Sequence, residues 1–123
     1  MDKGLTYLLD EIHLFLQLQE QKDIHTYEQL HYIKGKMVSP YYWLDNEEDF
    51  TETFKKYEIY NIKADYDESY RGSEDYFFTI RICFEKNGFI TITAENLSFA
   101  MNQLQVIIEN YYKNFIQNTN SEE

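Results

Sequence analysis

Residues 78–94 read FTIRICFEKNGFITITA, and this stretch decides the fold. Apolar side chains stand at positions 78, 80, 82 and 84, with mostly polar ones between them. A period of two is typical of a β-strand that buries one face. The segment Lys86-Asn87-Gly88 predicts a turn, and Phe89–Ala94 predicts a second strand after it. The stretch therefore predicts an antiparallel hairpin.

The register of this hairpin depends on the length of its turn. A two-residue turn at Asn87-Gly88 would place Ile90 and Ile92 on the face of Cys83. A three-residue loop, with Gly88 left-handed in a bulge, pairs Glu85 with Phe89 and puts positions 90, 92 and 94 on the face of 80, 82 and 84. We choose the second register because it separates apolar from polar side chains.

The same period of two precedes the hairpin, starting at Glu58. Tyr60, Ile62, Ala64 and Tyr66 are expected on one face of that strand. A polar loop, Asp67–Asp75, then leads to the hairpin. Together the three strands predict an antiparallel β-meander.

Helical spacing dominates the rest of the chain. Apolar residues predict a core helix over Lys3–Gln21 and an amphipathic helix of about twenty residues from Leu97 to Phe115. A capping-box pattern and a Lys-Gly end predict a short second helix, Thr26–Lys34.

A connection and a third helix complete the predicted order. Lys36–Leu44 contains Pro40 and three aromatic rings and should be extended. Asn46 is expected to cap a helix that runs to Tyr57 and carries positions 47–49 in its first turn. The order ααα-βββ-α predicts the α+β class, with a three-stranded meander packed against helices in a single domain over residues 1–117. Residues 118–123 should form a flexible acidic tail.

Composition indicates a folded protein of the cytoplasm. Aromatic residues make up 18% of the 123 residues, which is unlike a disordered chain. Cys83 is the only cysteine, so an intramolecular disulfide is impossible, and the N-terminus lacks the pattern of a signal peptide. Abundant isoleucine, asparagine, lysine and tyrosine are expected of A/T-rich coding, as in a low-GC bacterium, a phage or another mobile element.

The strongest functional signal is regional acidity. Asp45–Asp75 contains eleven carboxylates and four cations, and aromatic residues are interleaved with them. The chain has a formal net charge of −11, and its eleven basic residues are scattered along the sequence. Such a surface attracts basic partners and repels nucleic acid and anionic membranes. We expect no direct binding to nucleic acid or membrane.

Motifs for catalysis or metal binding are absent or incomplete. Glu28 and His31 have the E-x-x-H spacing of carboxylate-bridged metal sites, but a matching pair is lacking. Asp65, Asp67 and Ser69 begin an EF-hand-like pattern that fails at its glycine and final glutamate positions. Cys83 reads as an inert, half-buried thiol. We therefore expect no enzyme activity, cofactor or bound metal.

These observations favour a non-enzymatic acidic protein that occludes a basic surface of a partner protein. The partner would be a nucleic-acid-binding enzyme or a toxin, as for nucleic-acid mimics, phage anti-defence inhibitors and immunity proteins. The predicted partner-binding residues are Glu47, Glu48, Asp49, Glu52, Asp65, Asp67, Glu68, Glu74 and Asp75. Two alternatives remain open. The first is a self-associating structural or regulatory protein, a homodimer whose acidity serves solubility, and the second is a small ligand-binding or metal-dependent enzyme.

Overall fold

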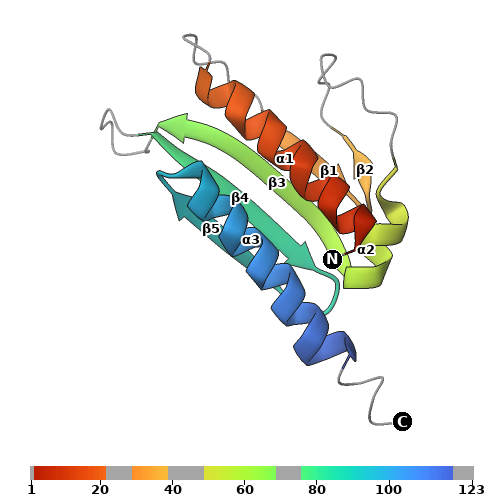
Figure 1. Ribbon diagram of the computed structural model, residues 1–123. Coiled ribbons are helices and arrows are strands. Elements are labelled where there is room, and N and C mark those ends of the chain that lie inside the picture. The colour runs from red at the N-terminus through yellow and green to blue at the C-terminus, as the bar shows by residue number, and fades with distance from the viewer. Residues whose placement is uncertain (1, 22–28, 39–48, 69–75, 118–123) are drawn as a thin grey trace.

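The computed structural model describes residues 2–21, 29–38, 49–68 and 76–117. Within them the chain forms a five-stranded antiparallel sheet of order β2-β1-β3-β4-β5, and two long helices lie on one of its faces (Figure 1). The elements are α1 (Lys3–Gln21), β1 (Leu30–Ile33), β2 (Lys36–Met37), α2 (Thr51–Tyr57), β3 (Ile59–Glu68), β4 (Tyr76–Phe84), β5 (Phe89–Ala94) and α3 (Leu97–Tyr111), followed by the π-helical segment η1 (Tyr112–Gln117). The α+β class is confirmed. The order ααα-βββ-α is wrong, because two strands take the place of the second predicted helix and its connection.

Helix α1 has the bounds that its apolar spacing predicts. Its buried side chains include Leu5, Leu8, Ile12 and Leu16, which recur every three or four residues and form one stripe. This stripe faces the sheet, where α1 contacts β3 and lies beside α3. Burial of this stripe, more than intrinsic helix propensity, stabilises α1.

The segment predicted as the second helix contains strand β1 instead. Leu30 and Tyr32 are buried and pair with Ala64 and Ile62 of β3, so the period here is two. The Lys34-Gly35 dipeptide does not end a helix. Both residues have positive φ, as in the two-residue turns that join hairpin strands, and they link β1 to β2. The start of the predicted helix, at Thr26, lies outside the described residues, as does most of the predicted connection Lys36–Leu44.

Helix α2 starts later than predicted. Asp49 and Phe50 are not helical, and the helix begins at Thr51. The Phe50 N–H donates to the Gly35 carbonyl at 2.9 Å, which holds the chain against the β1–β2 turn just before the helix. Asn46, the predicted cap, lies outside the described residues.

Strand β3 contains a bulge that the alternating pattern did not reveal. Ile59 pairs with Phe84 and Asn61 pairs with Cys83, so Tyr60 is an extra residue on β3. As a result Ile59 is 1% exposed and Tyr60 is 42% exposed, the reverse of the prediction. The strand also continues through Asp67 and Glu68, two residues expected in the loop. The rest of that loop lies outside the described residues.

The β4–β5 hairpin has the predicted faces but a different register. Gly88 has a φ of 83°, as expected for its left-handed position. Phe89 pairs with Cys83, however, and Ile90 with Ile82, so the pairs are shifted by two residues from the prediction of Glu85 opposite Phe89. An even shift leaves every side chain on its predicted face.

Helix α3 begins where Asn96 caps it. The Asn96 side chain accepts a hydrogen bond from the Phe99 N–H at 2.9 Å. The α-helix ends at Tyr111 and not at Phe115, and the wider turns of η1 follow. Phe115 is therefore 54% exposed, although its ring stays 5.0 Å from that of Tyr111.

The core lies between the sheet and one layer of helices. Side chains at 62, 64, 78, 80, 82, 92 and 94 are buried on the helix-covered face. The alternate positions, including 63, 65, 79, 81, 91 and 93, belong to the opposite face and are partly or fully exposed. We call this opposite face the outer face.

Candidate binding surface

The structure describes five of the nine predicted partner-binding residues: Asp49, Glu52, Asp65, Asp67 and, for its backbone alone, Glu68. Glu47, Glu48, Glu74 and Asp75 lie outside the described residues. The five fall into two groups, one beside α2 and one at the end of β3.

The group beside α2 consists of Asp49 and Glu52, both exposed. Asp49 Oδ1 accepts a hydrogen bond from the Thr51 N–H at 2.8 Å and another from the Thr51 hydroxyl. These two bonds, the hydroxyl first, lower the pKa of Asp49. The Asp49 carboxylate thus holds the backbone and hydroxyl of Thr51, the first residue of α2, which is a local structural role.

The second group lies along the last residues of β3. Asp65 and Asp67 share the outer face and are opposite Thr79 and Phe77 of β4. Glu68, the last strand residue, pairs with Tyr76. Three carboxylates therefore belong to this end of the β3–β4 pair, whereas Glu74 and Asp75 lie outside the described residues. We call Asp65, Asp67 and Glu68 the acidic end.

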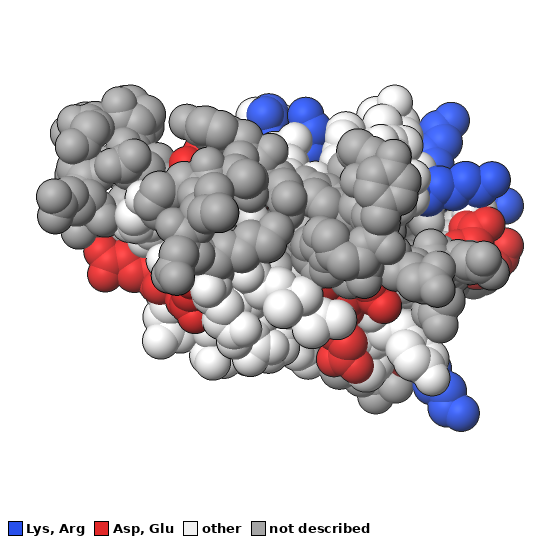
Figure 2. Space-filling view, turned by 90° about the horizontal axis from the view of Figure 1, so that it is seen from above, with Lys and Arg blue, Asp and Glu red and all other residues white. Residues whose placement is uncertain are grey.

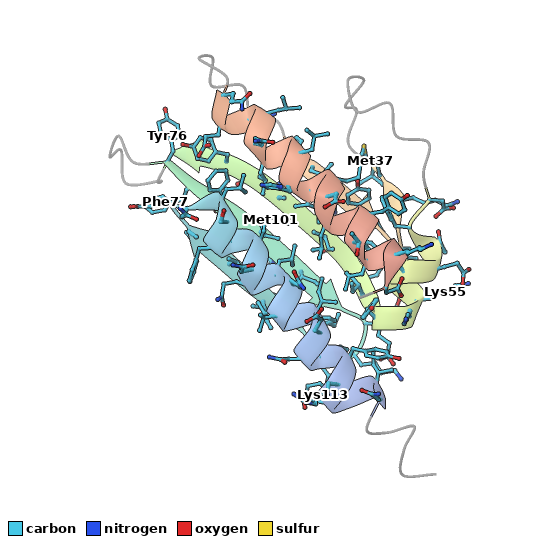
Figure 3. The ribbon with its side chains drawn as sticks, in the orientation of Figure 1. Met37, Lys55, Tyr76, Phe77, Met101 and Lys113 are labelled. Atoms are coloured by element: carbon cyan, nitrogen blue, oxygen red, sulfur yellow. The ribbon has the colours of Figure 1, made fainter. Side chains whose placement is uncertain are left out.

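The two groups lie at opposite ends of β3. Ile59, directly after α2, and Asp67 are eight residues apart on an extended strand, a distance of about 26 Å. In Figure 3, Lys55 of α2 lies at one end of the sheet, and Tyr76 and Phe77 lie at the other. The described residues of the predicted site therefore do not form one surface.

Asp65 is a partly buried carboxylate whose pKa is raised. Burial raises its pKa, the nearby charge of Asp67 adds to the increase, and a hydrogen bond from Gln29 opposes it. The Gln29 Nε2 donates to Asp65 Oδ2 at 3.2 Å. A cation placed between Asp65 and Asp67 would favour the charged form of Asp65. It would oppose both the effect of burial and the repulsion from Asp67.

Aromatic rings accompany the acidic end on the core side of the sheet. The Tyr66 ring stacks on that of Tyr76 with centroids 5.5 Å apart and lies 4.5 Å from that of Phe78. Burial, followed by the charge of Glu20, raises the pKa of Tyr66. The end of the sheet thus combines carboxylates with large, partly buried rings.

The outer face also carries a row of basic side chains that sequence reasoning missed. His31, Lys63 and Arg81 are direct neighbours across β1, β3 and β4. Within the described part of the chain, no ion pair joins Lys63 or Arg81 to a carboxylate, and the Arg81 guanidinium lies 3.7 Å from the Phe89 ring centroid. Figure 2 shows Lys and Arg side chains mainly along the side of the molecule that bears this face.

The three residues of this row occupy matching positions in the alternating patterns of their strands. That match could be recognised only once the register of the strands was known. The scattered basic residues of the sequence therefore include one local group. His31 belongs to this strand row rather than to an E-x-x-H pair on a helix, so the helical metal motif is not formed.

The described residues hold no group of three or more His, Cys, Asp or Glu side chains suited to binding a metal ion. Over the same ranges, the helices are too short or too polar to cross a membrane. Cys83 is a free thiol and half-buried, as expected.

Comparisons with known proteins found no counterpart. No family model matches the chain, and searches of curated proteins and of solved structures found no match.

Proposed function

We propose that this protein is a non-enzymatic acidic binding protein that occludes a basic surface of a partner protein through its acidic end. The observation that carries the proposal is the concentration of Asp65, Asp67 and Glu68 at the end of β3. A net charge of −11 supports it by favouring approach of a cationic partner from a distance.

The acidic end suits the side chains of lysine and arginine. Asp65 and Asp67 lie on one face of a strand, two residues or about 6.6 Å apart. Two carboxylates at this spacing resemble consecutive charges on a nucleic-acid backbone, so a nucleic-acid-binding enzyme or a basic toxin is the class of partner that fits. The neighbouring Tyr66 and Tyr76 rings supply apolar area for close contact.

This arrangement needs neither turnover nor a cofactor. Covering a cationic groove blocks the groove's own ligand, as inhibitors from phages and immunity proteins of toxin systems do by the same physical principle. Salt should weaken the complex, because the attraction is between charges that are screened in water.

The test is affinity capture from a bacterial lysate at low and high salt, with bound proteins identified by mass spectrometry. Asp67→Lys combined with Glu68→Lys reverses the acidic end. Asp10→Lys combined with Glu109→Lys makes the same charge change at exposed positions on α1 and α3. We expect a basic nucleic-acid-binding protein to be retained by the natural chain and by the control, released by salt, and displaced by duplex DNA.

Equal retention by the acidic-end variant would contradict the proposal. A captured partner that duplex DNA does not displace would favour a basic toxin over a nucleic-acid-binding enzyme. Circular dichroism of both variants should match the natural chain, because the substituted side chains lie at the surface or at a strand end.

A further inference from the structure

Strand β5 forms an edge of the sheet among the described residues, and it lacks the usual protection of an edge. Its sequence, FITITA, contains no charge, no proline and no bulge. The opposite edge, β2, is only two residues long and carries exposed Lys36. Short strands and lysines are devices that discourage edge-to-edge pairing, so the two edges differ in kind.

The free edge of β5 presents a regular set of backbone groups. The Phe84 N–H donates to the Gly88 carbonyl at 2.8 Å, which fixes the alternation of hydrogen bonds along this antiparallel pair. Gly88, Ile90 and Ile92 therefore direct their N–H and C=O groups toward β4. The corresponding groups of Phe89, Thr91 and Thr93 point away from the sheet.

An apolar flank borders this edge. Phe89 is 56% exposed, and Ile90 is 43% exposed although it lies on the core side of the sheet. On α3, Phe99 and Val106 are 54% and 47% exposed and lie two turns apart on one side of the helix. Helical geometry places both on the solvent-facing side of α3, away from the buried stripe of Ala100, Leu104 and Ile108.

We propose that β5 pairs in antiparallel fashion with β5 of a second copy of this chain, about a two-fold axis at Thr91. In this register Thr91 faces Thr91 of the other copy, and Phe89 faces Thr93. The outward N–H and C=O groups of all three residues then find partners, and a ten-stranded sheet results. Both α3 helices lie on the same side of this sheet.

The outward backbone groups of Phe89, Thr91 and Thr93 favour a second copy as the occupant, because they are self-complementary about Thr91. Two chains of net charge −11 repel each other, and β5 with its apolar flank offers an uncharged surface on which they can meet. Antiparallel pairing also keeps the acidic ends apart, because they fall at opposite ends of the joined sheet. The contact is isologous, so it closes as a dimer rather than extending into a filament.

The test is sedimentation equilibrium of the full chain over a concentration series. We expect a dimer of the 15.0 kDa chain that higher salt leaves intact or strengthens, because salt screens the repulsion. Thr91→Glu should raise the dissociation constant severalfold, up to about fivefold, since two carboxylates then face each other at the axis. The folded monomer should tolerate this change, because Thr91 is opposite Arg81 on β4.

Val38→Glu is the matched control. Val38 is 52% exposed beside the β2 edge, and the substitution adds the same negative charge to the chain. It should dimerise like the natural protein. Thr91→Pro is a second variant, which removes an outward N–H without adding charge and should also give monomers.

A natural chain that stays monomeric at about 1 mM would overturn the proposal, because even a millimolar dissociation constant would be visible there. So would a dimer that both Thr91 variants leave intact. The dimer does not depend on the acidic end, and the Asp67→Lys and Glu68→Lys variant should form it unchanged.

Discussion

Two glycines with left-handed backbone show how differently single residues constrain this fold. Gly35 has a φ of 90°, and a Cβ placed there would lie 2.4 Å from Thr51 N and 2.5 Å from the Phe50 carbonyl carbon. Gly88 has a φ of 83° and open space around the same position. The two glycines have similar backbone conformations, so the two sites differ only in the atoms that an added Cβ would meet.

We expect Gly35→Ala to destabilise the protein by at least about 2 kcal/mol and Gly88→Ala by about 1 kcal/mol. The first substitution forces backbone atoms apart at the junction of the β1–β2 turn and α2, whereas the second only adds left-handed strain. Urea unfolding followed by circular dichroism measures both free energies. Equal losses would show that the junction yields to the added methyl group.

At the scale of elements, long periodic segments were predictable and short ones were not. α1 has its predicted bounds because its stripe covers five turns of helix, and the faces of β4 and β5 follow from uninterrupted alternation. β1 has only four residues, too few to distinguish a period of two from a helical one, and the cap-like pattern around it favoured the wrong choice. The Tyr60 bulge has no signal of its own, because Ile59 and Tyr60 both suit a buried face.

The row of His31, Lys63 and Arg81 is an element-scale feature with a measurable consequence. Burial and then the charge of Lys63 lower the pKa of His31. A depressed histidine pKa means that the unfolded chain binds the proton more readily. The contribution of neutral His31 to the free energy of unfolding is therefore complete above its ordinary pKa of about 6.5. It is lost as the pH falls through the lower pKa that His31 has in the folded protein.

Lys63→Gln should raise the pKa of His31 toward its ordinary value, because one of its two causes is removed. It should also stabilise the protein by about 0.2–1 kcal/mol at pH 7, since Lys63 and Arg81 are like charges directly opposite each other. NMR titration and urea unfolding measure the two effects. Lys55→Gln, an exposed change on α2, is the control and should leave the His31 pKa alone. An unchanged His31 pKa in Lys63→Gln would show that burial alone sets it.

At the scale of the whole molecule, composition could predict a candidate site but not its geometry. Acidity along Asp45–Asp75 left open whether its carboxylates share one face. In the structure β3 runs through the middle of that stretch, and the described carboxylates lie toward opposite ends of the sheet. The distance between the two groups of carboxylates depends on the length of β3 and on the topology of the sheet. Likewise, the bare β5 edge became recognisable only when the sheet order placed β5 last.

Self-repulsion of a chain with a net charge of −11 should make its stability depend on salt in an unusual direction. The compact state brings like charges together, and the Lys56–Asp2 pair, at 2.7 Å, is exposed enough for water and salt to screen it. Salt should therefore screen the repulsion among the acidic residues more than it weakens this ion pair. We expect the thermal midpoint at pH 7 to rise by a few degrees, roughly 2–5 °C, between about 10 mM and 500 mM sodium chloride.

The increase should shrink toward zero near pH 4.6, the isoelectric point, because the net charge vanishes there. Differential scanning calorimetry at both pH values, with protein concentration held fixed, separates this effect from association. A midpoint that falls with salt at pH 7 would mean that attractive ion pairs outweigh repulsion in the folded chain. Even in that case the eleven basic residues can neutralise at most half of the 22 acidic residues, so negative charge would remain to attract a basic partner.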